Sequence, residues 1–304
     1  MTGVDIFKLF FSWCVVEIHW SAMTRFVYPS EIEWLINNAV PFFFVASGYL
    51  LSRKMGRQPQ PTELRQCSLK SFKLFLLWII IYIPLDATKF IFDGFGLRNS
   101  VSCVITLILS GEGIYSWPMW YVYSLAISLL IMSLASKYRY GFVVLFLLMC
   151  GINLAQFYHK IPIYALELIS SRALGGTHFI LAGWLMPRLV GGVKTALVGF
   201  GLVLASYLSY IHQLPFWTLI GGVGFFYVAS SLSVLKFNST YIRKTSVWIY
   251  YLHMYIVVGM SKLFIAHLFE LSNTQMNLIT LLCVTSVGAL LSIMQSRRLN
   301  RLLG

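Results

Sequence analysis

Long apolar runs separated by short polar gaps make up most of the chain. A membrane-spanning helix needs about 20 residues to cross a hydrocarbon core of ~30 Å. The runs near that length lie at residues 5–22, 36–52, 69–90, 117–136, 140–157, 172–189, 192–211, 215–235, 245–266 and 275–295. We therefore predict an all-α integral membrane protein, a bundle of about ten transmembrane helices. The run at 101–109 is too short to cross, so we expect a re-entrant or interfacial segment there.

Lysine and arginine residues lie mainly in the gaps and helix ends, on one side of the predicted membrane. With the N-terminus inside, the cytoplasmic set is Arg53, Lys54, Arg57, Arg65, Lys70, Lys73, Lys137, Arg139, Arg188, Lys194, Lys236, Arg243, Lys244, Arg297, Arg298 and Arg301. Most acidic residues fall on the opposite side, and this bias is typical of membrane topology. An eleventh span at 101–109 would invert everything after it, so we predict ten spans with both termini cytoplasmic.

The composition supports a membrane protein and argues against other classes. Hydrophobic residues make up 58% of the chain and charged residues only 11%, whereas about a quarter of the residues in soluble domains are charged. The net charge of +13 is not gathered into one patch with interleaved aromatics, so we expect no nucleic-acid partner. No repeat or soluble domain is visible, and we expect residues 1–304 to form a single transmembrane domain without an appended soluble domain.

The cysteines and the N-terminus carry no further signal. The five cysteines, Cys14, Cys67, Cys103, Cys150 and Cys283, form no CxxC motif and show no metal-ligand spacing, so we expect a structural role for them and no metal. The first run lacks a basic region followed by a small-residue cleavage site, which favours a retained helix over a signal peptide.

The first apolar run contains Lys8, Glu17 and His19, and ionisable groups at membrane depth are costly and usually functional. Ten residues separate Lys8 from His19, so on a helix the two lie within roughly 20° of each other and about 16 Å apart along the axis. Glu17 points about 180° away from Lys8 and is not an obvious partner of His19. A neutral imidazole can take a proton from a hydroxyl group. Two alternatives stay open: a His19 hydrogen-bonded between helices, and a Lys8 that extends to the inner headgroups.

Two further groups of residues have both a functional and a structural interpretation. Ser47-Gly48, after Pro41 in the second run, allows either a neighbouring backbone or a ligand to come close. The basic cluster from Arg53 to Lys73 ends in Lys70 and Lys73, which share a helix face and can hold a phosphorylated ligand. The same charges also serve as topology signals.

Several motifs occur in order along the chain. They are Lys8 and His19 ten residues apart, Pro41-Phe42-Phe43-Phe44 followed by Ser47-Gly48-Tyr49-Leu50, Lys70 with Lys73, Trp120-Tyr121, and Tyr251-Leu252-His253. Together they resemble the acyltransferase-3 family of membrane acyltransferases. The likeness covers nearly the whole chain.

The resemblance implies a multi-pass enzyme of the bacterial inner membrane. Such an enzyme takes an acyl group, commonly acetyl, from cytoplasmic acyl-CoA and delivers it to a hydroxyl of a surface polysaccharide, such as lipopolysaccharide or capsule, or of its lipid-linked precursor. We expect His19 to be the general base, either in direct transfer or through an acyl-histidine. The candidate donors to the oxyanion are Tyr121, Trp120 and Ser47.

The resemblance also implies a binding region for the acyl donor. Lys8 and His19 match the family's first-helix pair, and Lys70 and Lys73 stand where the family commonly has two arginines. Lysine lacks the bidentate fork of arginine. We expect the phosphates of acyl-CoA near Lys70, Lys73 and Arg65, with the pantetheine arm passing Lys8.

Four further residues are second-tier candidates for the functional site: His178, His253, Glu112 and Arg172. A transporter or flippase is the main competing class, because intramembrane His, Lys and Glu also mark transport pathways. A non-catalytic scaffold or sensor is a third class, and it would not depend on CoA.

Overall fold

The structure is a computed structural model that describes residues 2–92, 97–158, 167, 169–187, 191–232, 238–265 and 271–294. Across these ranges the elements are helices and there is no strand, as predicted. The predicted cytoplasmic residues Arg188, Lys236, Arg297, Arg298 and Arg301 lie outside the described residues, as do the last residues of several predicted spans.

The chain divides into two compact units, and each is described by itself. We call Met1–Phe43 with Leu189–Gly304 the terminal unit, and Phe44–Arg188 the central unit. The boundary falls inside helix α3 (Ala39–Met55), so both units share that helix.

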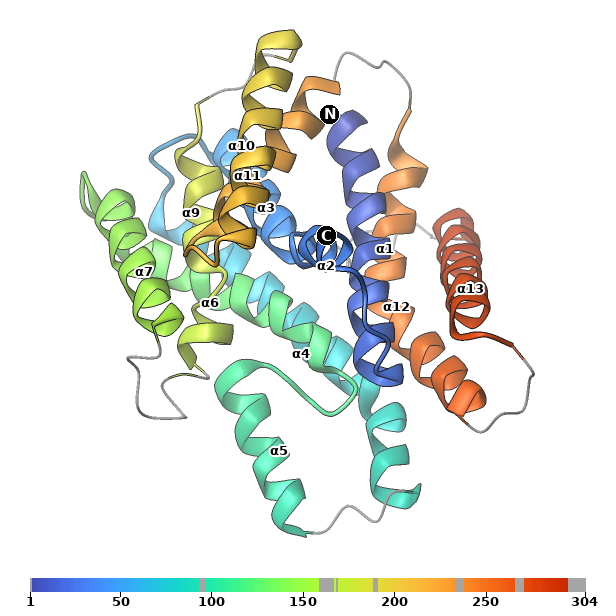
Figure 1. The fold of residues 1–304 in the computed structure, drawn as a ribbon. Helices are drawn as coiled ribbons and strands as arrows, with labels where there is room; N and C mark the ends of the chain where they lie inside the picture. Colours follow the sequence, from blue (N-terminus) through green and yellow to red (C-terminus); the bar gives the residue numbers. More distant parts are fainter. Residues whose placement is uncertain are drawn as a thin grey trace. The chain divides into compact units, whose positions relative to one another are not determined.

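The terminal unit is built around its first helix. Its helices are α1 (Thr2–Thr24), α2 (Ser30–Asn37), the start of α3, α10 (Val193–Ile211), α11 (Trp217–Ser231), α12 (Thr240–Ile265) and α13 (Asn273–Met294). Helix α1 packs against α12 and α11, α13 lies along α12, and α10 lies along α11 (Figure 1). The chain therefore returns after more than 200 residues to pack its last helices on its first.

Close packing and polar contacts fix α1 at several points. A Cβ on Gly3 would lie 2.1 Å from the Ala229 carbonyl oxygen, so only glycine allows this approach of α1 to α11. The indole of Trp13 donates to the Thr285 hydroxyl at 3.0 Å, and the indole of Trp20 donates to the side-chain oxygen of Asn273 at 2.8 Å. Buried indole N–H groups need such acceptors, and here both acceptors belong to α13.

The central unit holds the remaining helices. They are the end of α3, α4 (Pro61–Phe92), α5 (Leu97–Ser110), the 3-10 turn η1 (Trp117–Met119), α6 (Trp120–Ala135), α7 (Gly141–Phe157), the π-helical turn η2 (Ile169–Ala173) and α9 (Thr177–Leu185). Helix α6 packs along α4, where the Ser68 hydroxyl donates to the Ala126 carbonyl at 2.7 Å, and α9 packs along α7.

The ten predicted spans all fall on helices, at least in part, but fewer of these helices are long and apolar enough to cross a membrane. Within the described residues, six qualify by length and composition: Thr2–Thr24, Ser30–Met55, Pro61–Lys89, Trp117–Ala135, Val193–Ile211 and Asn273–Met294. The run predicted at 172–189 is shortened because η2 and the turn after it precede α9. The protein has the character of a multi-pass membrane protein, whereas the count of ten and the cytoplasmic termini stay predictions.

Candidate functional site

Helix α1 carries Lys8 and His19 on one uninterrupted helix, as the spacing predicts. Both side chains are partly buried. Lys8 interacts electrostatically with Asp5, one turn earlier, and with Arg243 of α12. Asp5 also accepts a hydrogen bond from the Ser239 hydroxyl at 2.6 Å. Lys8 therefore belongs to a charged cluster at one end of α1, about 16 Å along the axis from His19.

His19 stacks on a second histidine, His253 of α12. The two ring centroids are 5.0 Å apart and the planes are inclined by 25°. His253 is fully buried, and its Nδ1 lies 2.7 Å from the Tyr250 carbonyl oxygen and 3.1 Å from that of Ile249. Because a carbonyl only accepts hydrogen bonds, these contacts assign the proton to Nδ1. Nε2 is buried and has no hydrogen-bond partner among the described residues. Because an unpaired buried charge is costly, we infer a neutral ring with its lone pair on Nε2.

Glu17 is satisfied by neighbours other than Lys8 and His19, in agreement with its predicted position on the opposite face. The Tyr28 hydroxyl donates to Glu17 Oε2, and the Asn277 amide donates to the same oxygen at 2.7 Å. Burial, followed by the hydrogen bond and the charge of Glu17, raises the pKa of Tyr28 above its ordinary value. This carboxylate therefore links α1 to α13 and to the loop after α1.

In the central unit, two of the predicted residues meet directly. The Ser47 hydroxyl lies 3.0 Å from the Tyr121 hydroxyl, which joins α3 to the start of α6. The ring of Phe44 packs on Tyr121 with centroids 4.5 Å apart and on Trp120 at 5.8 Å. Gly48 serves helix packing, because a Cβ there would lie 2.0 Å from the Ile180 carbonyl oxygen of α9.

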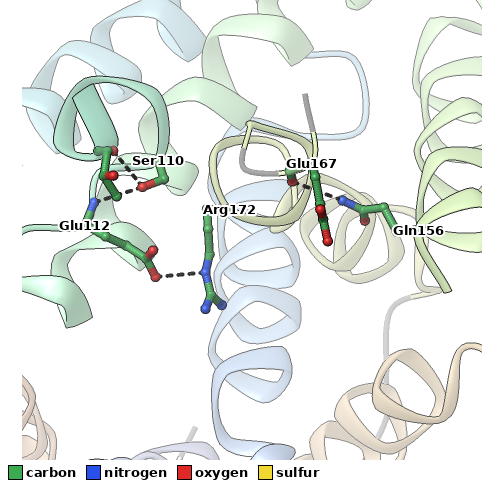
Figure 2. Close-up of polar contacts among 6 residues, drawn as sticks. Ser110, Glu112, Gln156, Glu167 and Arg172 are labelled. Carbon is green, nitrogen blue, oxygen red and sulfur yellow. Dashed lines mark hydrogen bonds and ion pairs between the residues drawn. The ribbon is translucent and has the colours of Figure 1, made fainter. Parts of the chain in front are cut away.

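Two second-tier candidates, Glu112 and Arg172, form an ion pair beside Trp120. Arg172 Nε lies 2.8 Å from Glu112 Oε1 (Figure 2), and the guanidinium carbon lies 5.0 Å from the centroid of the Trp120 ring. The Glu112 backbone N–H donates to the Ser110 hydroxyl at 3.3 Å. Burial raises the pKa of Glu112, and the positive charge of Arg172 acts in the opposite direction.

A second hydrogen bond is drawn in the same figure as Arg172. Figure 2 shows the Gln156 side-chain amide donating to the Glu167 carbonyl oxygen at 3.5 Å. Further along the chain, His178 of α9 is buried, and the cavity that it lines together with Gln156 has a volume of only about 10 Å³. That cavity is too small for a ligand.

The three cations predicted to bind the donor phosphates lie on α4, whereas Lys8, the fourth predicted donor-binding residue, lies on α1. Arg65, Lys70 and Lys73 have exposed side chains, whereas Leu64 and Ser68 of the same helix are buried. Lys70 and Lys73 share the exposed face, as their spacing predicts. Their role in donor binding stays a prediction.

Sequence reasoning missed two pairings. His253 was visible through the Tyr251-Leu252-His253 motif, but the motif does not identify its neighbour as His19. Glu112 and Arg172 are 60 positions apart, and no local pattern connects them.

Comparison with known proteins identifies the family. The sequence model of the acyltransferase-3 family, described as an acyltransferase domain, matches residues 1–294. The chain belongs to the acyltransferase-3 family. An acyltransferase-type function follows from that membership, and the resemblance drawn from the sequence motifs is confirmed. No curated protein and no solved structure matches the chain. All the candidate site residues named above lie within residues 1–294, the part that matches the acyltransferase-3 family.

Proposed function

We propose that this acyltransferase-3 protein transfers an acyl group, acetyl in the first instance, from cytoplasmic acyl-CoA to a hydroxyl of a cell-surface polysaccharide or its lipid-linked precursor. The proposed location is the bacterial inner membrane. The observation that carries the proposal is the partly buried His19, stacked on a neutral histidine within a chain of an acyltransferase family.

His19 serves as the general base in this proposal. As the acceptor oxygen attacks the thioester carbonyl, the imidazole takes the hydroxyl proton. The new C–O bond forms, the C–S bond breaks, and the leaving CoA thiolate takes the proton from the His19 imidazolium. Direct transfer and an acyl-histidine intermediate both use this imidazole.

His253 supports this role as a positioning residue. Its Nδ1–H donates to two backbone carbonyl oxygens, which fixes the ring and its neutral tautomer. A neutral ring on the face of His19 places no second positive charge beside the imidazolium that forms during the reaction. Like-charge repulsion would otherwise disfavour that protonated form.

The same proposal keeps two predicted groups in their roles. The Ser47 and Tyr121 hydroxyls orient each other, and one of them, or Trp120, donates to the developing oxyanion. Lys70, Lys73 and Arg65 attract the phosphates of the donor, and its pantetheine arm passes Lys8.

The experiment that tests the proposal supplies membranes containing the protein with radiolabelled acetyl-CoA and measures label in polysaccharide. We expect His19→Ala to lower incorporation at least about 10²-fold, in line with the loss of a general base. His212→Ala is the matched control, because His212 is exposed at the end of α10. Full incorporation by His19→Ala at equal protein level would reject His19 as the base. A transporter or scaffold would give no CoA-dependent label with any variant.

A further inference from the structure

A cavity of about 440 Å³ lies in the central unit where two predicted cytoplasmic connections meet. The α3–α4 connection contributes Arg57, the α6–α7 connection contributes Lys137, Tyr138 and Arg139, and Trp184 comes from the end of α9. The volume is within the range of about 300–1,000 Å³ that small-molecule sites occupy.

The charge on the cavity wall has one sign. Arg57, Lys137 and Arg139 line it, and its described lining includes no aspartate or glutamate. Lys137 and Arg139 have exposed side chains that are available to a ligand. Three cations around one small cavity favour a ligand with several negative charges, such as phosphate groups.

Three aromatic side chains, Tyr138, Phe142 and Trp184, also line the cavity. Trp184 is almost fully buried, and Phe142 meets it edge to face with ring centroids 5.4 Å apart. The Trp184 indole donates to the Arg57 carbonyl oxygen at 3.5 Å, and the Arg57 guanidinium donates to the Met186 carbonyl at 3.4 Å. Tyr138 is exposed beside these rings. Aromatic faces and guanidinium groups stack on flat heterocycles, so the wall suits a ligand that combines phosphate with a base.

The α6–α7 turn presents its cations on a fixed backbone. The Tyr138 N–H donates to the Ala135 carbonyl at 3.0 Å, and the Gly141 N–H donates to the Tyr138 carbonyl at 3.0 Å. A Cβ on Gly141 would lie 1.9 Å from the Ala135 carbonyl oxygen, so the turn closes only with glycine at this position. A ligand therefore meets cations whose backbone is already ordered, which lowers the entropy cost of binding.

We propose that this cavity binds a nucleoside phosphate, with the base against the aromatic wall and the phosphates on Arg57, Lys137 and Arg139. The inference rests on the proposed function, in which the ligand is the phosphorylated adenosine end of acyl-CoA. It places the bound adenosine end at the α6–α7 turn, while the exposed cations of α4 attract the donor phosphates from solution before the donor binds. A phospholipid headgroup offers the same phosphate chemistry without a flat base, and the test distinguishes the two sources.

The test uses the full chain in nanodiscs and adenosine 3′,5′-bisphosphate as the probe, with affinity measured by calorimetry. We expect the double variant Lys137→Gln and Arg139→Gln to weaken binding about tenfold or more for each cation removed. Its KM for acetyl-CoA should rise while kcat stays unchanged, because ground-state and transition-state binding weaken equally. Lys194→Gln, an exposed cation outside the cavity, is the control and should bind normally.

A second variant tests the aromatic part of the site. Tyr138→Leu should weaken adenosine 3′,5′-bisphosphate binding about fivefold or more, as expected when an aromatic stacking partner is removed, and leave inorganic pyrophosphate binding unaffected. Equal losses for both probes would overturn the assignment of a base to this wall.

The remaining outcomes are decisive. Normal probe binding in the double variant, or a loss only in Lys70→Gln with Lys73→Gln, would overturn the site. Competition by phosphatidylglycerol nanodiscs with no nucleotide binding would assign the cavity to a lipid headgroup. Probe binding with the expected dependence but no acyl transfer would keep the site and reject the proposed function. Acyl transfer with an unchanged KM in the double variant would keep the proposed function and reject the site.

Discussion

Replacing Gly48 by alanine tests the close crossing of α3 and α9 in the central unit. A Cβ on Gly48 would lie 2.0 Å from the Ile180 carbonyl oxygen, and a Cβ on Gly183 would lie 2.1 Å from the Val45 carbonyl oxygen. Each helix therefore presents a glycine to the backbone of the other. Ordinary contact begins at 3.4 Å, so the alanine requires the helices to separate locally by about 1.4 Å.

The expected cost follows from two opposing effects. Overpacking costs about 1–3 kcal/mol, and we expect the upper end because the obstacle is backbone, which cannot rotate away. Alanine gains up to about 1 kcal/mol over glycine within a helix. The net loss is about 2 kcal/mol, which lowers the unfolding midpoint by about 4–8 °C for a unit of this size.

The assay is thermal unfolding of the purified protein in detergent, followed by the folded fraction that remains on size-exclusion chromatography. Gly183→Ala should reproduce the loss, because the contact is reciprocal. Gly151→Ala in α7 is the matched control, since nothing lies within 4 Å of its Cβ position. We expect that control to be as stable as the parent or slightly more stable. If Gly48→Ala behaved like Gly151→Ala, the direct backbone contact between α3 and α9 would be refuted.

Three further predictions concern single side chains. Tyr121→Phe tests which side chain is the oxyanion donor: loss of that donor should lower kcat for acyl transfer about 10²-fold in the labelled assay, and a change in stability alone would leave the role to Ser47 or Trp120. Burial raises the pKa of Glu112, so the folded state favours the protonated carboxyl, and this contribution to stability is present at low pH and lost as the pH rises through the raised pKa. The unfolding midpoint of the parent should therefore fall more than that of Glu112→Gln between pH 4 and pH 7. If the two midpoints changed in parallel with pH, burial would not outweigh the charge of Arg172 in setting the pKa of Glu112. Tyr28→Phe removes a donor to the Glu17 carboxylate and should cost about 1.5–3 kcal/mol, measured by thermal unfolding; an unchanged midpoint would show that Asn277 alone satisfies Glu17.

The sequence by itself determined the helices and the positions of residues along each of them. Hydrophobicity and helical periodicity are local properties, so the runs, the shared face of Lys8 and His19, and the opposite position of Glu17 were all predictable. The motif order also sufficed to identify the family. The number of spans was harder to predict from the sequence. A helix interrupted by turns, as before α9, has the same apolar composition as an uninterrupted one.

The tertiary structure alone decided which side chains meet. His19 contacts a histidine more than 230 positions away, and Glu112 pairs with Arg172 through a π-helical turn that no periodicity indicates. The same holds for the cavity at the α6–α7 turn, whose cations looked like ordinary topology signals. Apolar helices pack in many pairings of similar energy, because small residues and Leu-rich faces fit several partners. The choice among them depends on contacts such as Gly48 on Ile180, which exist only after distant segments have come together.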